Sequence, residues 1–308
     1  MRHEIVINAS ALEVRVALLE DGSLAEFYLE RNTRTGLAGN IYKGKVTRVL
    51  PGMQAAFVDI GLEKAGFLHV SDFHNEAEAF DTIAEVAGET DVETEPVDET
   101  IAVEVPITFE DGAIAAAESA VLEQHGDPSP EGGSRGRGRG HRRAPRRVRL
   151  PIEQQLHRNQ EIIVQIAKEP MGTKGARLTS SISLPGRHLV YTPTNNHIGI
   201  SRRIESAEER NRLRSAVSEM RPAQGGFIVR TACEGVSKRE IQRDIAFLTR
   251  LWNSILKKSE NQAPAAALYS DLDVAMRTVR DLFSSDVDRL WCDDPETHRR
   301  ILEFVHTY

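Results

Sequence analysis

NIYKGKVTRVLPGMQAAFVDIGLEKAGFLHV, residues 40–70, is the most informative segment of this chain. Residues 41–50 show strand-like alternation and are followed by a Pro-Gly pair, which is a strong turn signal. Residues 53–61 form a second run of β-branched and aromatic residues, and a third run begins at Phe67 after a glycine. These runs predict neighbouring strands joined by tight turns, as in a small β-barrel.

The alternation of the first run separates two kinds of side chain. Tyr42 and Val46 are expected on one face of the strand, and Lys43 and Lys45 on the other, because successive side chains of a strand point to opposite faces. The lysines therefore predict a cationic outer surface on the barrel.

Phe57 and Phe67 belong to the two runs that follow. Aromatic side chains beside cations suit single-stranded RNA, because the cations neutralise phosphates and each stacked base contributes about 1–3 kcal/mol. The alternative is that both phenylalanines lie in the core, as a phenylalanine in a strand usually does. The pattern alone leaves both possibilities open.

Charge and composition must be considered by segment. The net charge of −7 looks unsuited to an RNA-binding protein, but residues 72–149 alone hold 18 acidic and 8 basic side chains. The remainder is slightly basic. With 308 residues and 40% hydrophobic content, the chain is long enough for about two domains with real cores.

The cysteine content and the amino terminus indicate a cytoplasmic protein. Cys233 and Cys292 are isolated, which matches neither a disulfide framework nor a zinc motif. Residues 1–19 are interrupted by charges and do not resemble a secretory signal, and no apolar run is long enough to span a membrane.

A compositionally biased insertion interrupts the barrel. Residues 76–131 are acidic and rich in Ala and Thr, whereas residues 132–149 read GGSRGRGRGHRRAPRRVR. Both parts are expected to be disordered. The Arg-Gly tract either contacts RNA phosphates or acts as a solvated linker whose charges pair loosely with the acidic part.

The first residues predict a hairpin that needs a partner elsewhere in the chain. Residues 4–17 alternate as one strand, and a turn at residues 20–22 leads into a second strand at 24–29. Since an isolated hairpin is marginally stable, it must pair with a later segment.

Order is expected to return at residue 161 with two further barrel strands, at 161–169 and 176–182, and a short strand pair at 187–192 and 198–201. Capping boxes at Ser206 and Ser237, and a weaker one at Ser270, predict three helices. The second helix carries an apolar stripe that should pack on a core. Later elements are a buried strand at 226–232, a strand at 290–292 and a helix from about Pro295.

Two groups of polar residues are candidates for chemistry. Arg202, Arg230 and Thr231 follow strands and would form a phosphate pocket if those strand ends converge, although most such arginines are solvated. The acidic residues between Asp271 and Asp294 lie at helix starts and turns, where carboxylates usually cap or solvate rather than hold two metal ions.

Four blocks, NIYKGKVTRVLPGMQAAFVDIGLEKAGFLHVSD, AKEPMGTKGARLTSSISLPGRHLVY, GISRRIES and GGFIVRTACEG, resemble the amino-terminal half of the ribonuclease G and ribonuclease E family, and its ribonuclease G branch in particular. The resemblance implies a mixed α+β fold in which an OB-type barrel is inserted in a ribonuclease H-like subdomain. It assigns residues 1–36 and 205–308 to that subdomain, 37–182 to the barrel with its insertion at 76–149, and 183–204 to a 5′-sensor region.

The resemblance also implies site residues. By position, Phe57, Phe67 and Lys174 match the residues that hold RNA on the barrel. Lys43 and Lys45 are further RNA-binding candidates from the alternation of their own strand. The residues that match the sensor of a 5′-monophosphate are Gly186, Val190, Arg202, Arg230 and Thr231.

Family members cleave single-stranded RNA with a magnesium ion held by two aspartates of a later subdomain, and form homodimers or homotetramers joined through zinc. This chain stops at Tyr308, so the resemblance predicts no catalytic residue or metal site here and no activity of the chain alone. The alternatives are a non-catalytic RNA-binding regulator and, less well supported, an unrecognised nuclease that uses Asp271 and Asp273.

Overall fold

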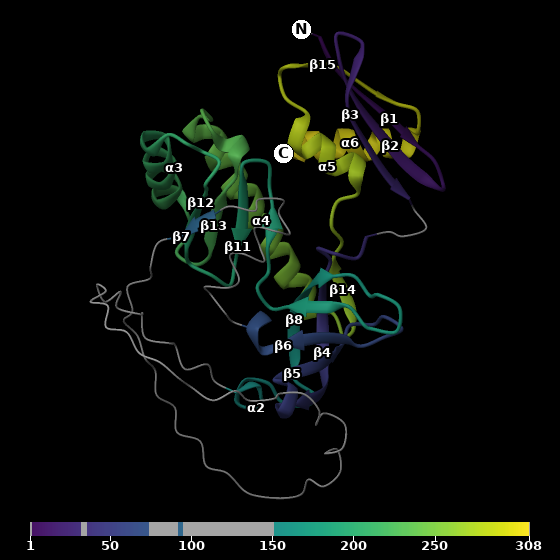
Figure 1. The fold of residues 1–308 in the computed structure, drawn as a ribbon, viewed down its shortest axis with the longest axis vertical. Coiled ribbons are helices and arrows are strands. Elements are labelled where there is room, and N and C mark those ends of the chain that lie inside the picture. Colours follow the sequence, from purple (N-terminus) through teal and green to yellow (C-terminus); the bar gives the residue numbers. More distant parts are fainter. Residues whose placement is uncertain (1, 32–35, 74–91, 95–150, 308) are drawn as a thin grey trace, which may run out of the picture. The chain divides into compact units, whose positions relative to one another are not determined.

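The computed structural model describes residues 2–31, 36–73, 92–94 and 151–307, whose strands form three sheets (Figure 1). Most of the insertion expected to be disordered lies outside the described residues. Within it, however, β7 (Val92–Thr94) pairs with another strand, so the expectation of disorder was wrong for this short piece.

One sheet closes into a five-stranded barrel. β4 (Ile41–Leu50) pairs with β5 (Ala55–Asp59) on one side and with β8 (Glu161–Lys168) on the other. β6 (Gly66–His69) and β9 (Arg177–Thr179) complete the circuit, so the barrel closes across the insertion as predicted. Its core contains Tyr42, Val46, Val58, Leu68, Val164, Ile166 and Leu178.

Two details of the barrel differ from expectation. The turn after β4 is a short 3-10 helix, Pro51–Met53, followed by Gln54 in the left-handed region, so β5 begins at Ala55 rather than at residue 53. In addition, β14 (Ala266–Tyr269) adds to the start of β4 as an extra strand that the sequence did not reveal. Short strands between helices give little local signal.

A second sheet has the order β15-β1-β2-β3. The strand expected at residues 4–17 is two strands, β1 (His3–Ala9) and β2 (Glu13–Glu20), because the Ser10 hydroxyl accepts the Glu13 N–H and closes a turn. β3 (Ser23–Arg31) follows the predicted turn, where Asp21 and Gly22 both have positive φ.

The partner that the first hairpin needs comes from the end of the chain. β15 (Val287–Cys292) pairs with β1 in parallel, and α5 (Val274–Leu282) and α6 (Pro295–Thr307) share a core with this sheet. The cap of α5 is Asp273, whose carboxylate accepts the Met276 N–H, and not Ser270 as expected. Whether this part resembles ribonuclease H stays a prediction.

The third sheet has the order β10-β11-β13-β12-β7. β13 (Gly226–Val229) lies between β11 (Leu189–Thr192) and β12 (Ile198–Ser201), so the expected pairing of those two strands was wrong. β10 (Leu184–Pro185) forms the outer edge through a hairpin with β11.

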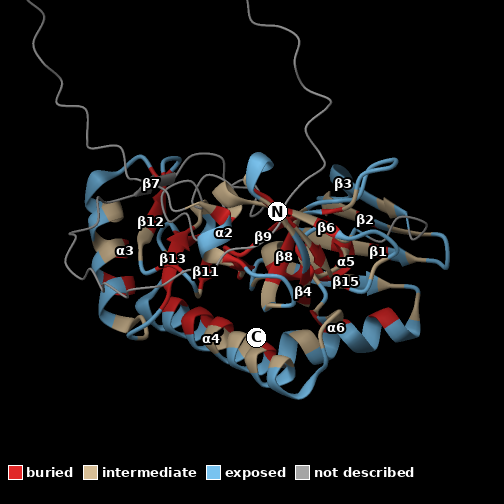
Figure 2. Ribbon diagram, turned by 90° about the horizontal axis from the view of Figure 1, so that it is seen from below, coloured by how far each residue is buried: buried red, intermediate tan, exposed pale blue. Residues whose placement is uncertain are grey.

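α3 (Ala207–Met220) and α4 (Lys238–Asn261) pack on the third sheet. The stripe of α4 is buried as predicted, and Figure 2 shows buried positions recurring along this helix between exposed ones. Because Ile200 and Ile204 share a core with Leu213 and Ile241, the boundary expected between residues 204 and 205 falls inside one hydrophobic core.

Candidate nucleic-acid interface and anion site

Phe57 and Phe67 form an aromatic pair on the outside of the barrel. They lie directly opposite each other on β5 and β6, with ring centroids 6.0 Å apart and planes at 67°. Their neighbours Val58 and Leu68 are buried in the core, whereas both phenylalanine rings are partly exposed. The alternative that the phenylalanines are core residues is therefore wrong.

His69 extends this aromatic surface. Its ring stacks on Phe67 with centroids 6.5 Å apart and planes at 26°. The ring is oriented by Ser71, whose hydroxyl lies 2.7 Å from Nδ1 and whose N–H donates to the same nitrogen. Sequence reasoning missed His69, although its spacing of two residues from Phe67 places it on the same face.

The two barrel lysines differ in their surroundings. The Lys43 ammonium donates to the carbonyls of Ser259 and Gln262, at 2.9 and 3.0 Å, and forms an ion pair with Glu161 at 3.0 Å. Lys43 therefore fixes the end of α4 to the barrel, and its ammonium is already engaged within the fold. The Lys45 ammonium has no such partner among the described residues, and Lys45 faces Asp59 across the β4–β5 ladder.

Lys174 lies in the turn that joins β8 to β9. Met171 and Lys174 exchange two backbone hydrogen bonds, and the next residue, Gly175, packs so closely on Ala65 that a Cβ would stand 2.0 Å from the Ala65 carbonyl oxygen. The N–H of Phe67 donates to the carbonyl of Ala176, the residue that follows this glycine. The structure thus places the turn that carries Lys174 beside the start of β6, although about 110 residues separate Lys174 from Phe67 in sequence.

The strand ends from which a phosphate pocket was expected lie at one edge of the third sheet. β12 and β13 are parallel neighbours, so Arg202 and Arg230, which follow them, emerge at the same edge of the sheet. Thr231 comes next, with its Oγ1 3.2 Å from Ser201 Oγ. The two strand ends are therefore neighbours, and the phosphate pocket itself stays a prediction.

Arg230 is held within the fold rather than solvated. Its Nη1 donates to the carbonyls of Gly186 and Arg187, at 2.7 and 3.3 Å, and to Asp281 Oδ1 at 2.8 Å. The side chain is 13% exposed. Asp281 also accepts two hydrogen bonds from Arg280, each 2.9 Å. Burial alone would raise the pKa of Asp281, but Arg280 and then Arg230 outweigh it and lower that pKa.

Gly186 and Val190 have structural roles in the β10–β11 hairpin. A Cβ on Gly186 would stand 2.6 Å from Asp244 Oδ1, so glycine is required at this close approach. Asp244 accepts the N–H groups of His188 and Leu189, at 3.0 and 2.9 Å, and fixes the turn. The Val190 side chain is fully buried, so it cannot itself contact a ligand.

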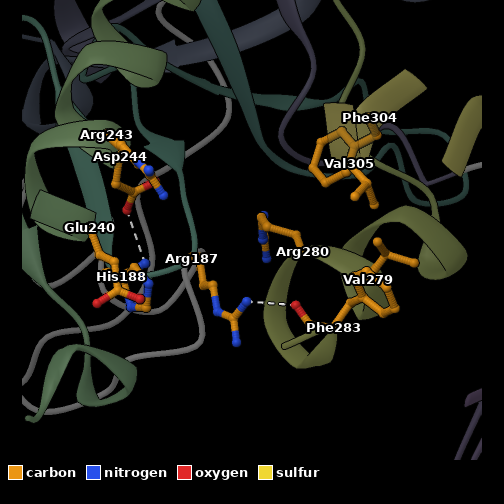
Figure 3. A pocket seen from close by; sticks show the side chains of 10 residues that line it. All are labelled: Arg187, His188, Glu240, Arg243, Asp244, Val279, Arg280, Phe283, Phe304 and Val305. Atoms are coloured by element: carbon orange, nitrogen blue, oxygen red, sulfur yellow. Dashed lines mark hydrogen bonds between the residues drawn. The ribbon is translucent and has the colours of Figure 1, made fainter. Parts of the chain in front are cut away.

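A cavity of about 220 Å³ lies beside this turn (Figure 3). Arg187 reaches across it and donates to the Phe283 carbonyl at 2.6 Å. Sequence reasoning missed this cavity, because four separate segments of the chain form it and none carries a local signal. One wall is polar and includes Arg187, His188, Glu240 and Arg243. The other combines the apolar side chains of Val279, Phe283, Phe304 and Val305 with Arg280.

The acidic residues near the end of the chain act on the backbone. Asp288 accepts the His3 N–H and Asp293 the Ala9 N–H, so both help to dock β1. Asp294 caps α6 by accepting the Thr297 N–H. Within the described ranges, no three His, Cys, Asp or Glu side chains gather as a metal ion would require.

None of the helices that the structure describes has the length and apolarity needed to cross a membrane.

Comparisons with known proteins match this organisation. Residues 38–108 match the S1 RNA binding domain, and residues 183–308 match the ribonuclease E/G family. Over 308 residues the chain is 38% identical to ribonuclease G of Escherichia coli, and over 305 residues it is 36% identical to ribonuclease G of Haemophilus influenzae. These matches cover 100% and 99% of the chain but 51% and 50% of the relatives.

Ribonuclease E of a Nostoc species is 30% identical over 271 residues, which is 88% of the chain and 30% of that protein. The chain therefore spans about half the length of the ribonuclease G relatives and less of ribonuclease E.

Proposed function

Because this chain belongs to the ribonuclease E/G family, we propose that it forms the RNA-holding part of a ribonuclease G-type endoribonuclease that acts on single-stranded RNA. The observation that carries the proposal is the aromatic surface of Phe57, Phe67 and His69 on the outside of the S1 barrel. Bases stack on these rings, while Lys45 and Lys174 neutralise the neighbouring phosphates.

We further propose that the chain recognises a 5′-monophosphate at the converging ends of β12 and β13. A terminal monophosphate carries more charge than an internal diester, and guanidinium groups bind its oxygens in pairs. Arg202 and Thr231 stand at this edge, beside the anchored Arg230. Held at its end and along its length, a strand would be positioned for cleavage elsewhere in the enzyme.

We assign no catalytic residue to this chain. Magnesium for cleavage, zinc between protomers and assembly into dimers or tetramers are proposals for the complete enzyme. The described residues would contribute by binding and orienting the strand.

The test of RNA holding is Phe57→Ala, measured with a 3′-labelled oligoribonucleotide that has a 5′-hydroxyl. If Phe57 stacks a base, affinity falls by about 1–3 kcal/mol, or roughly 5–150-fold. Phe27→Ala is the matched control, because Phe27 is 55% exposed on β3, outside the barrel. Equal affinity of the Phe57 variant and the unmutated chain would refute this assignment.

The test of end recognition compares 5′-monophosphate with 5′-hydroxyl ends. Arg202→Ala and Thr231→Val should each reduce the preference for the monophosphate, because a hydrogen bond to a charged group contributes about 1.5–3 kcal/mol. These variants test ligand binding more specifically than Arg230→Ala, because that change also removes hydrogen bonds that hold the fold. An unmutated chain that binds both ends equally would disprove the sensor.

A further inference from the structure

Arg48 continues the line of the aromatic pair across the barrel. On β4 it pairs with Phe57 of β5, which in turn pairs with Phe67 of β6. Neighbouring strands are about 4.8 Å apart. Arg48, Phe57 and Phe67 therefore form one row across the three strands, with about this distance between neighbours. A strand of RNA lying over the two rings therefore meets Arg48 next.

Beyond Arg48 the barrel surface is hollowed. The pairing of β4 with β8 ends at Lys45, so β8 does not cover the later part of β4. The segment from α2 (Ile152–Gln155) to Arg158 lies beside this later part of β4 instead. Between the segment and the strand is an open groove of about 670 Å³. Arg48, His157 and Arg158 line the groove, and Glu153 is the one acidic residue among its described lining.

The arginines of this groove differ from other cations near the aromatic pair. Arg177 forms two hydrogen bonds to Asp72, at 2.9 and 3.1 Å, and the Lys64 ammonium donates to the Gly172 carbonyl at 2.7 Å. The guanidinium groups of Arg48 and Arg158, in contrast, make no hydrogen bond or ion pair to the rest of the described chain. Both are exposed, so binding a phosphate would break no interaction of the described fold.

We propose that the groove of Arg48, His157 and Arg158, here named the edge groove, is a second RNA subsite that binds the phosphates next to the nucleotides stacked on Phe57 and Phe67. This inference rests on the proposed RNA-holding function. Guanidinium forks match phosphate oxygens in pairs, and the imidazole plane of His157 offers a further face for a base. The groove is large enough to admit a nucleotide.

The test uses the full chain and a single-stranded RNA decamer with a 5′-hydroxyl, which does not engage the proposed 5′ sensor. In Arg48→Ala/Arg158→Ala, affinity at low salt should fall about tenfold or more. The slope of log affinity against log salt should become shallower by about 0.7 for each phosphate that the variant no longer neutralises. Arg250→Ala is the control, since it removes one exposed arginine from α4, outside the barrel, and should change neither quantity.

A second measurement locates the RNA directly. Photo-cross-linking of the same decamer containing 4-thiouridine should label residues 152–158 in addition to β5 and β6.

The variant Arg48→Lys keeps the positive charge, so the affinity of this variant should retain most of its dependence on salt.

The outcomes separate this inference from the proposed function. If Phe57→Ala weakens binding while the double arginine variant binds normally and residues 152–158 stay unlabelled, the edge groove is not a subsite. If neither variant changes binding, the RNA-holding function itself fails. Thermal unfolding of the variants, expected to be unchanged because both side chains are exposed, verifies that folding is not the cause.

Discussion

Arg230 donates to two backbone carbonyls and to the Asp281 carboxylate. A phosphate bound by this guanidinium must therefore share it with a fixed negative charge. The pKa of Asp281 is lowered, so its contribution to stability is present above its ordinary value of 3.8 and is lost as pH falls below that value. At neutral pH the carboxylate is charged and would compete with the phosphate of the proposed ligand.

Asp281→Asn should therefore strengthen binding of 5′-monophosphorylated RNA about threefold to tenfold while leaving 5′-hydroxyl RNA unaffected. The same change removes the negative charge that pairs with Arg280, and the Arg280 side chain is only 6% exposed. The free energy of unfolding should therefore drop by about 1–3 kcal/mol. Paired binding curves and a denaturant titration measure the two effects. Weaker monophosphate binding by the variant would mean that Asp281 positions Arg230 for the ligand instead of competing with it.

At the scale of elements, α3 and α4 are joined through one carboxylate. Ser206 caps α3, but Glu209 does not return to the cap as a complete capping box requires. It accepts two hydrogen bonds from Arg212 and one from the Gly235 N–H, just before α4. The Arg212 hydrogen bond is the main cause that lowers the pKa of Glu209 to about 2.

Glu209→Gln should lower Tm at pH 7 by about 2–4 °C, as expected for a partly exposed ion pair. The stabilisation is fully present above pH 4.5, the ordinary value for this group, and is lost as pH falls toward 2. The difference in Tm between the variant and the unmutated chain should therefore shrink in scans from pH 5 downward. A difference that stays constant with pH would show that the charge of Glu209 is not its source.

At the scale of the whole molecule, the first and last strands depend on each other. Leu290 of β15 pairs with Ile5 of β1 and faces the core shared with α5 and α6. The barrel has a separate core. Damage to β15 should therefore spread to the amino-terminal sheet before it reaches the barrel.

Leu290→Asp places a charge in that core and should cost about 3 kcal/mol or more. Amide hydrogen exchange should show reduced protection in β1 and β15 and unchanged protection in β4 and β8. Trp291→Asp is the matched control, because Trp291 is 52% exposed and its variant should keep the native protection. An equal reduction in the barrel strands would indicate a single cooperative unit.

The elements that could be predicted from the sequence are those formed by interactions between residues close together in the chain. The barrel strands and the caps of α3 and α4 depend on neighbouring residues, so alternation, turn residues and capping boxes predict them. The insertion of β13 between β11 and β12, and the addition of β14 to β4, depend on pairings between distant segments that leave no local pattern. Strand order was accordingly the main error in the fold.

The same distinction applies to the site. Phe57 and Phe67 follow from a local pattern and from the resemblance to the family, whereas the pairing of β12 with β13, which brings Arg202 and Arg230 to one edge, does not follow from a local pattern. The structural role of Lys43 was missed because the alternation of a strand identifies its outer face but not the helix end that lies against it. Asp281 was not linked to Arg230 because 51 residues separate them.

The parallel pairing of β1 with β15 also has a consequence for synthesis on the ribosome. About 280 residues must be added between the two strands, which at roughly 5–20 residues per second takes roughly 15–60 s. During that interval the nascent amino-terminal hairpin has an open edge of unpaired backbone groups, the kind of edge that recruits other chains. The barrel strands β4 to β6 emerge before β15, so this sheet is completed later than they are. Slow translation or a shortage of chaperones should therefore affect the yield of this protein through its first residues.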